Sequence, residues 1–314
     1  MNIVCIGEAL IDFKATGALA FQGYVGGSPL NVAVAASRLG GEVGFAAQVS
    51  TDMFGDDIVA FMHENGVDTA FVERSDAPST LAFVSEIGGD AHFSFMANGA
   101  ADTLYDPRPR PVFPEPSYLQ FGSISLLADP TATAITETVA AHKGRTTIVF
   151  DPNVRPALIS DRGTYLEKLE RWLALADIVK ISAQDLSWLA PGMDVEELVS
   201  GWLERGPQAV IVTRGAEGAS LLRQGRPIVT VPAPCVAVVD TVGAGDTFTG
   251  ALMVALLERG GGSMTGLSDE DAREVLRFAA AAAALNCRRA GADPPNRPEL
   301  ASYLERNDCR EGRG

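Results

Sequence analysis

The chain has 314 residues, of which 46% are hydrophobic, 21% are charged and 7% are aromatic, enough for one large α/β domain or two smaller domains. Its 25 Lys and Arg against 40 Asp and Glu give a formal net charge of −15, which excludes a basic nucleic-acid-binding face and electrostatic docking on an anionic membrane. The charge does not exclude an anionic small substrate, because a few oriented N–H groups can bind phosphate locally.

The sequence is not typical of a secreted, membrane-bound or disulfide-stabilised protein. Its four cysteines are far apart and include no C-x-x-C pair, which argues against a zinc site and a disulfide framework. Glu8 and Asp12 interrupt the first apolar run too early for a signal peptide, and no stretch of about 18 apolar residues could cross a bilayer. We therefore expect a cytoplasmic protein.

The first third of the chain predicts two strand–helix pairs. Residues 2–7 form a continuous apolar run that ends at glycine, as expected for a strand buried on both faces. A helix is predicted over 30–39, with Asn31 in its first turn, and a second strand and helix follow over 43–49 and 56–65. This order is the beginning of a parallel α/β sheet.

The pattern then changes to a hairpin. Residues 80–87 and 91–96 have strand-like composition, and the glycine-rich turn 88–90 between them leaves no room for a helix. Because a hairpin inserted into a βα series usually forms a separate layer, we interpret this segment as a candidate lid.

Strands and helices alternate again in the rest of the chain. Strands are predicted over 118–121, 146–150, 178–181 and 209–213, a second hairpin over 219–222 and 227–231, and helices over 130–142, 164–174, 195–204, 245–258 and 269–285. This alternation predicts an α/β fold with a mostly parallel sheet covered by helices on both faces.

The strongest local motif is the stretch 240–248, Asp-Thr-Val-Gly-Ala-Gly-Asp-Thr-Phe. Gly243 and Gly245 let backbone N–H groups converge at the start of a helix, which predicts an anion hole. A carboxylate such as Asp246 would repel phosphate there unless it receives a proton from an attacking hydroxyl. Alternatively, Asp246 caps the helix and the glycines form a tight turn. The loop is neither a Walker A motif nor G-x-G-x-x-G.

This motif resembles the PfkB (ribokinase-like) family of carbohydrate kinases. The resemblance extends to stretches near the start, middle and end of the chain, and several of them are similar to the bacterial fructokinase branch in particular. The stretches are 7–13 (Gly-Glu-Ala-Leu-Ile-Asp-Phe), 26–31 (Gly-Gly-Ser-Pro-Leu-Asn), 121–125 (Phe-Gly-Ser-Ile-Ser), 151–156 (Asp-Pro-Asn-Val-Arg-Pro), 213–218 (Thr-Arg-Gly-Ala-Glu-Gly) and 290–295 (Ala-Gly-Ala-Asp-Pro-Pro).

The resemblance implies the fold and the catalytic groups. It implies one ribokinase-like domain over residues 1–314, a three-layer α/β/α fold with a small β-lid built from segments near 13–28 and 72–97. Asp246 would be the general base, and the amides of Gly243, Ala244 and Gly245 would hold the charge that develops on the transferred phosphoryl group. We expect the Asp246 carboxylate to stay ionised at the helix start and to accept the proton late in the attack.

The resemblance also implies sugar-binding residues. Asp12, Gly27 and Asn31 would bind sugar hydroxyls, although Asp12 could be a turn residue and Asn31 a helix cap. Arg155 follows a buried strand and could reach a substrate oxygen or a nucleotide phosphate, or else form a surface ion pair.

The lid hairpin carries a further set of candidates. Phe83, Phe93 and Phe95 could exclude water from the sugar, but alternating aromatics also form small cores, and we expect that role for at least two of them. Asn98 and Asp102, just after the lid, are weaker candidates for substrate contact. Because the lids of relatives often pair between subunits, a homodimer formed through the lid is expected.

For the nucleotide, Thr213, Gly215 and Gly218 resemble the family's contact to ATP phosphate and ribose, although such a turn alone has little specificity. Ala281, with Ala284 beside it, and Asn286 lie on an Ala-rich helix that would flank the adenine. Small residues serve close helix packing equally well, so that alternative stays open.

The expected metal sites depart from the family pattern. The sequence Ser182-Ala-Gln-Asp185 replaces the family's Asn-x-x-Glu, so Asp185 would hold Mg²⁺ through water and direct metal contacts are in doubt. Many family members also bind K⁺ near the anion hole. By resemblance, the Asp240 carboxylate and the carbonyls of Val242 and Gly291 would hold it here.

These features together predict an ATP-dependent sugar kinase that phosphorylates a primary hydroxyl, with fructose as the expected substrate and ATP and Mg²⁺ as cofactors. The alternatives within the family are 2-keto-3-deoxygluconate, ribose, and a riboside such as aminoimidazole riboside or a nucleoside. An acidic sugar would need an extra cation in the pocket, and Arg155 is the candidate. A catalytically silent sugar-binding regulator is a different class, which the intact Asp246 and glycines disfavour.

Overall fold

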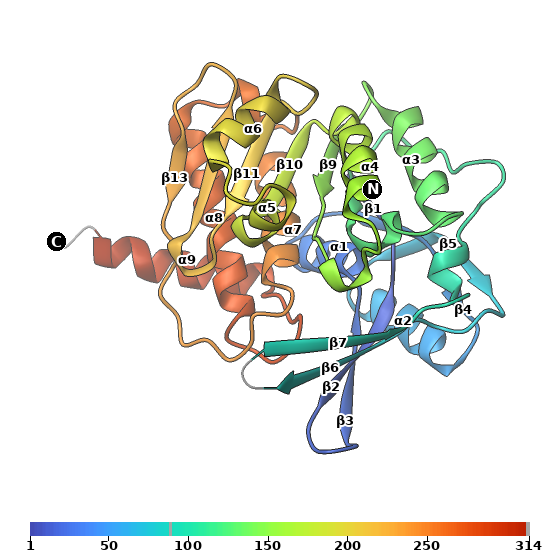
Figure 1. The fold of residues 1–314 in the computed structure, drawn as a ribbon. Coiled ribbons are helices and arrows are strands. Elements are labelled where there is room, and N and C mark those ends of the chain that lie inside the picture. The colour runs from blue at the N-terminus through green and yellow to red at the C-terminus, as the bar shows by residue number, and fades with distance from the viewer. Residues whose placement is uncertain (88–89, 312–314) are drawn as a thin grey trace.

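The computed structural model describes the backbone of residues 1–87 and 90–311, and the side chains of residues 1–84 and 94–306. A nine-stranded sheet lies at its centre, with helices on both faces and a smaller sheet below it (Figure 1). The strand order is β13-β12-β11-β10-β9-β8-β1-β4-β5. Neighbouring strands are parallel except where β12 pairs with β11 and β13. The predicted α/β fold with a mostly parallel sheet is confirmed.

The strands of the large sheet are β1 (Ile3–Ile6), β4 (Val43–Ser50), β5 (Asp68–Ser75), β8 (Tyr118–Gly122), β9 (Thr147–Asp151), β10 (Ile178–Ser182), β11 (Ala209–Thr213), β12 (Ala219–Arg223) and β13 (Val229–Val231). The helices are α1 (Ser28–Arg38), α2 (Met53–Glu64), α3 (Thr131–His142), α4 (Arg162–Leu175), α5 (Ala183–Leu189), α6 (Val195–Leu203), α7 (Ala244–Leu257), α8 (Asp269–Asn286) and α9 (Arg297–Glu311). The predicted elements are all present. The strands β2, β3 and β5 and the helices α5 and α9 were not predicted.

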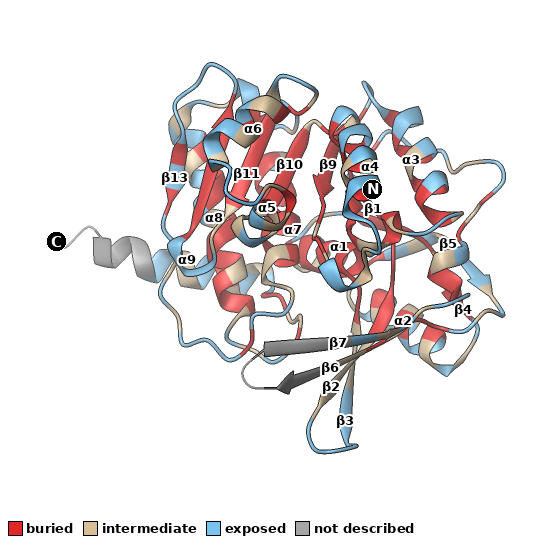
Figure 2. Cartoon of the chain, in the orientation of Figure 1, coloured by how far each residue is buried: buried red, intermediate tan, exposed pale blue. Residues whose placement is uncertain are grey.

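The large sheet separates two hydrophobic cores. Ile3 and Cys5 of β1 pack in the core with α1, α7 and α8, whereas Val4 and Ile6 of the same strand pack in the core with α3, α4 and α6. Since successive side chains of a strand point to opposite faces, burial on both faces requires the continuous apolar run seen in the sequence. The central strands are correspondingly buried along their whole length (Figure 2).

The small sheet has the strand order β3-β2-β6-β7, with β2 (Leu10–Ala15), β3 (Phe21–Gly26), β6 (Leu81–Ile87) and β7 (Asp90–Met96). The bounds of this small sheet differ from those of the predicted lid segments, near 13–28 and 72–97. Residues 72–75 belong to β5, which pairs with β4 at the edge of the large sheet, and residues 10–12 belong to the small sheet. Two residues of the predicted turn, 88 and 89, lie outside the described residues.

Aromatic side chains hold the small sheet together and join it to α2. The rings of Phe13 and Phe83 stack with their centroids 5.1 Å apart, and Phe21 and Phe54 contact the pair edge-on. Phe83 therefore belongs to a small aromatic core. This is the role that we expected for at least two of the lid phenylalanines. The side chain of Phe93 lies outside the described residues.

Helices α1 and α7 approach each other closely at Gly250. A Cβ added at Gly250 of α7 would lie 2.7 Å from the carbonyl oxygen of Val32 and 2.9 Å from the Cβ of Ala35, both on α1. Only glycine fits this crossing without displacement of a helix. The crossing sets the distance between the N-terminal ends of the two helices.

We predict that Gly250→Ala lowers the free energy of unfolding by about 1–3 kcal/mol, because the added methyl group overpacks this contact. Urea denaturation measures the change. Gly201→Ala in α6 is the matched control, since a Cβ there meets no atom within 4 Å. The control should be stabilised by about 0.5–1 kcal/mol, the usual gain for Ala over Gly in a helix. Equal effects at the two positions would contradict the prediction.

Candidate active site

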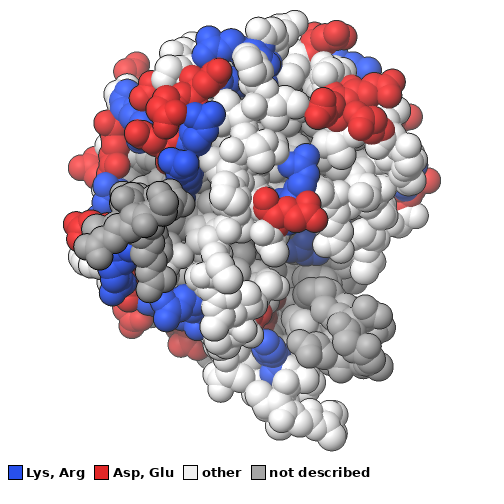
Figure 3. All heavy atoms as spheres, turned by 90° about the vertical axis from the view of Figure 1, so that its left-hand side faces the viewer, with Lys and Arg blue, Asp and Glu red and all other residues white. Residues whose placement is uncertain are grey.

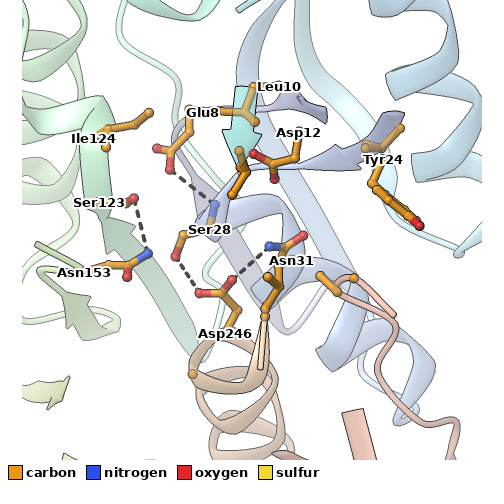
Figure 4. A pocket seen from close by; sticks show the side chains of 18 of the residues that line it. Glu8, Leu10, Asp12, Tyr24, Ser28, Asn31, Ser123, Ile124, Asn153 and Asp246 are labelled. Atoms are coloured by element: carbon orange, nitrogen blue, oxygen red, sulfur yellow. Dashed lines mark hydrogen bonds between the residues drawn. The ribbon is translucent and has the colours of Figure 1, made fainter. Parts of the chain in front are cut away.

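A cavity of about 420 Å³ opens between the small sheet and the N-terminal ends of α1 and α7 (Figure 4). Most of the polar groups that line it come from segments far apart in the chain. They include Glu8, Asp12, Lys14, Tyr24, Gly27, Ser28, Asn31, Asn153, Arg155, Asp240, Gly243, Gly245 and Asp246. The predicted catalytic loop, the predicted sugar ligands Asp12, Gly27 and Asn31, and Arg155 thus meet in one cavity.

Asp246 lies in the first turn of α7 and is buried. Ser28 Oγ donates a hydrogen bond to its Oδ1 at 2.7 Å, and Asn31 Nδ2 donates to its Oδ2 at 2.9 Å (Figure 4). Burial raises the pKa of Asp246 above its ordinary value, although these two hydrogen bonds oppose the rise. The raised pKa makes the carboxylate a stronger base than an ordinary Asp, and its late acceptance of the proton stays a prediction.

The loop before Asp246 depends on its glycines. Gly243 caps α7 with a left-handed backbone (φ 73°), and a Cβ there would lie 2.5 Å from the Cβ of Ala292. A Cβ at Gly245 would lie 2.7 Å from Lys180 Nζ. A side chain at Gly243 would collide with Ala292 in a backbone conformation that favours glycine, and one at Gly245 would have to displace the Lys180 ammonium.

Lys180 lies beneath this loop and was not singled out from the sequence. Its Nζ is 2.9 Å from Asp151 Oδ2, and both side chains are buried. Burial lowers the pKa of Lys180, but the charge of Asp151 and the hydrogen bond to it raise the pKa by more, so the ammonium stays charged. A buried cation therefore lies against the backbone of the predicted anion hole.

Asp12 and Gly27 occupy the opposite wall of the cavity. Burial raises the pKa of Asp12 to about 6, with Arg155 opposing and Asp246 adding to the rise. Gly27 has a φ of 108°, and a Cβ there would lie 2.6 Å from the carbonyl oxygen of Glu8, so this position also requires glycine. Arg155 lines the cavity and donates from Nη1 to Asn153 Oδ1 at 2.7 Å.

Three lid-side candidates lie away from this cavity. Phe95 and Asn98 are not among the described residues that line it, and Val84 of β6 is. Asp102 is buried and accepts a hydrogen bond from Thr80 Oγ1 at 2.6 Å. None of these three side chains is among the described residues that line the cavity, and their contact with the sugar stays a prediction.

The nucleotide candidates form a separate region beside the carboxyl end of β11. Gly215 and Gly218 have positive φ, and a Cβ at Gly218 would lie 2.0 Å from the Val231 carbonyl, which fits a tight turn. The hydroxyl of Thr213 lies 3.4 Å from the carbonyl oxygen of Ile181. The roles of these residues in ATP binding stay predictions.

The helix expected to flank adenine is closely packed. Ala281 is buried within α8, and Asn286 at its end is fully buried. Asn286 Nδ2 donates to the Val242 carbonyl at 2.7 Å, and its Oδ1 has no hydrogen-bond partner. Asn286 thus ties the end of α8 to the anion-hole loop, a contact for which the sequence carried no signal.

The residues expected to handle metal ions have protein partners. Ser182 caps α5 by accepting a hydrogen bond from the Asp185 amide at 3.0 Å. Burial raises the pKa of Asp185, with the charge of Asp151 adding to the rise and that of Lys180 opposing it. In the described residues, no group of three His, Cys, Asp or Glu side chains is placed to hold a metal ion.

Glu8 and Ser28 are site residues that sequence reasoning missed. The Glu8 carboxylate accepts hydrogen bonds from the Ser28 amide at 3.2 Å and from Ser125 Oγ at 2.6 Å, and it fixes the start of α1. Burial raises the pKa of Glu8 to about 7. The sequence does carry one signal for Glu8, because it is a charged residue inside the otherwise apolar stretch 3–11.

Comparison with known proteins decides the family. Residues 1–299 match the model of the pfkB family carbohydrate kinases. The chain belongs to this family. Over 259 residues it is 36% identical to a fructokinase of Rhizobium leguminosarum bv. trifolii, a match that covers 81% of this chain and 79% of that relative.

Solved structures agree with this assignment. The ATP-bound fructokinase of Xylella fastidiosa is 31% identical, with a TM-score of 0.88 and 98% of each chain covered. A double mutant of the Vibrio cholerae O395 fructokinase, solved with fructose, ADP and a potassium ion, is 27% identical with a TM-score of 0.87, covering 96% of this chain and 97% of that one. The ribokinase-like fold predicted for this kinase is confirmed.

On the face shown in Figure 3, basic side chains are interspersed with acidic ones rather than gathered in one patch. No helix in the described ranges is long and apolar enough to cross a bilayer.

We predict that Glu8 makes stability depend on pH. Its pKa is about 7 in the folded protein and near 4.5 when unfolded, so the folded state binds the proton more tightly. The stabilisation is complete below pH 4.5 and is lost as the pH rises to 7, by on the order of 3 kcal/mol. Relative to Glu8→Gln, which cannot titrate, the native chain should lose unfolding free energy between pH 4.5 and pH 8. Parallel urea-denaturation profiles would contradict this.

Proposed function

We propose that this carbohydrate kinase transfers the γ-phosphoryl group of ATP to a primary hydroxyl of fructose. The observation that carries the proposal is the Asp246 carboxylate, buried between Ser28 and Asn31 and directly beside the glycine loop in one cavity. A base and an anion hole in adjacent positions are what phosphoryl transfer to an alcohol needs. The fructose and ATP seen in related structures support the choice of substrates.

In the proposed reaction, the hydroxyl oxygen of the sugar attacks the γ-phosphorus while the bond to the β–γ bridging oxygen breaks. The hydroxyl proton passes to Asp246, and ADP leaves with the bridging oxygen. Ser28 and Asn31 already occupy one acceptor position on each carboxylate oxygen, which fixes the carboxylate and leaves a lone pair for the incoming proton. Its raised pKa makes the transfer more favourable.

The charge that develops on the phosphoryl oxygens would be balanced by the amides of Gly243, Ala244 and Gly245 and by the start of α7. Lys180 lies directly behind Gly245 and adds a buried positive charge to the same place. This arrangement allows a strongly acidic protein to bind triphosphate without a basic surface.

The balance of charges in the cavity favours a neutral sugar. Among the described residues, four carboxyl groups line it, together with two cationic groups, Lys14 and Arg155. Lys14 pairs with Asp240, and Arg155 is held by Asn153 while its charge opposes the raised pKa of Asp12. A sugar acid would bring a further negative charge to this acidic cavity, so the presence of Arg155 there does not by itself favour 2-keto-3-deoxygluconate.

Magnesium would enter with ATP. Mg²⁺ retains several waters and binds through one or two carboxylates together with phosphates, which suits Asp185 near Asp151. It would neutralise phosphate charge. We also propose that the nucleotide site is lined by Ser182, Thr213, Gly215, Gly218, Ala281 and Asn286. Residues 1–314 would form a single kinase domain, and the protein would be cytoplasmic.

The small sheet would close over the sugar and would also form a homodimer interface. Leu19, Phe21 and Met96 on this sheet and its connecting turn are exposed apolar side chains, as a subunit interface requires. The solvent-facing edges of β3 and β7 offer strands for pairing.

We predict that Asp246→Asn lowers kcat with fructose by about 10²–10⁴-fold, because the amide cannot accept the hydroxyl proton. ADP release measures the rate, and the thermal midpoint reports folding. Asp57→Asn, an exposed residue of α2, makes the same change of charge away from the cavity and should retain full activity. Full activity of Asp246→Asn would overturn the proposed base.

We predict that kcat/KM is highest for fructose in a panel that includes ribose, aminoimidazole riboside, 2-keto-3-deoxygluconate and nucleosides. The neutral polyol matches the acidic cavity best, and the keto-acid should be the poorest of the sugars. Thermal shifts with each compound and a non-hydrolysable ATP analogue separate binding from turnover. Binding without ADP release for every compound would indicate a regulator rather than a kinase.

A further inference from the structure

The side chain of Asp240, at the start of the anion-hole loop, has a complete set of donors from this chain. Lys14 Nζ and the Gly291 amide each donate to Oδ2 at 3.0 Å, and the Val242 amide donates to Oδ1 at 3.1 Å. The carboxylate is mostly buried, whereas Lys14 is 41% exposed. The Gly291 and Lys14 hydrogen bonds outweigh the effect of burial and hold the pKa of Asp240 below its ordinary value.

These contacts do not fit the potassium site that the sequence predicts. That site would use the Asp240 carboxylate with the carbonyls of Val242 and Gly291. The carboxylate already accepts the N–H of Gly291, and one lone pair of the Val242 carbonyl accepts a hydrogen bond from Asn286 at 2.7 Å, so the Asp240 carboxylate and this carbonyl are each partly taken by protein donors. The Lys14 ammonium is already 3.0 Å from Asp240 Oδ2, and it would repel a second cation at this carboxylate.

The cationic group comes from a distant part of the chain. Lys14 belongs to β2 of the small sheet, whereas Asp240 precedes α7, 226 residues later. Both residues line the cavity that contains Asp246 and the glycine loop. The ion pair therefore joins the small sheet to the loop whose amides face the phosphoryl group.

We infer that the Lys14 ammonium takes the place of a monovalent cation beside the anion-hole loop, so that catalysis by this chain is independent of potassium. Lys14 acts as a positioning residue: it neutralises Asp240, and the neutralised carboxylate holds the amides of Val242 and Gly291 and with them the loop. The test of this inference by ADP release rests on the proposed function, whereas the test by thermal midpoint does not.

The test compares the native chain with Lys14→Met, which keeps the length of the side chain and removes its charge. ADP release with fructose and Mg²⁺ is measured in KCl and in choline chloride at equal ionic strength. The native rate should differ by less than twofold between the two salts. Lys14→Met should be slowed at least tenfold in choline chloride and restored by KCl with saturation. Lys168→Met on α4 is the matched control and should behave like the native chain.

A second readout needs no turnover. The thermal midpoint of Lys14→Met should rise with KCl more than with choline chloride, because a cation can then bind at Asp240, and the native midpoint should not differ between the salts. Lys14→Arg should resemble the native chain in both readouts.

The inference is overturned if potassium stimulates the native enzyme more than about threefold, or if Lys14→Met responds to neither salt in rate or midpoint. The native measurement can overturn it even where Lys14→Met does not fold. If no sugar is phosphorylated, the proposed function fails, and the thermal midpoints still decide the role of Lys14.

Discussion

The close crossing of α1 and α7 is the contact on which the candidate site depends. Gly250 allows the backbones to approach, and the first turns of the two helices then bring Ser28 and Asn31 to the Asp246 carboxylate. Because the helices are close, both hydrogen bonds form at ordinary lengths and the carboxylate is buried, which raises the pKa of Asp246. Packing at one glycine thus sets both the position and the basicity of the proposed base, four residues away along α7.

The distribution of charge follows from burying an anion-binding loop inside an acidic protein. The positive groups near the loop are few and internal: Lys180 against Asp151 beneath it and Lys14 against Asp240 beside it. Each cation is paired with a carboxylate, which lowers the cost of burial; the Lys180–Asp151 pair is buried, whereas Lys14 and Asp240 both line the cavity. The net charge of −15 describes the exterior and has little bearing on the field in the cavity.

Much of this could be predicted from the sequence because the signals are local. The apolar run of β1 and the glycine loop before Asp246 follow from backbone geometry and periodicity, and both were placed correctly. The contacts that depend on distant segments were not accessible in this way. Lys14 and Asp240 are 226 residues apart, and no periodicity links them; β5 is a half-exposed edge strand with weak alternation. Val84 of β6 is among the described residues that line the cavity and Phe95 is not, a difference that depends on how the small sheet packs and that no local pattern shows.

Glu8 has a mechanical consequence for the small sheet. Only residues 7–9 separate β1 from β2, and the Glu8 carboxylate fastens this connection to the start of α1 and to Ser125. The base of the small sheet is therefore anchored to the rigid core, and its connection to β1 cannot act as a free hinge. Any opening of the cavity therefore has to bend β2 and β3 beyond Leu10, so that the far ends of the strands travel while the base of the sheet at Leu10 keeps its place.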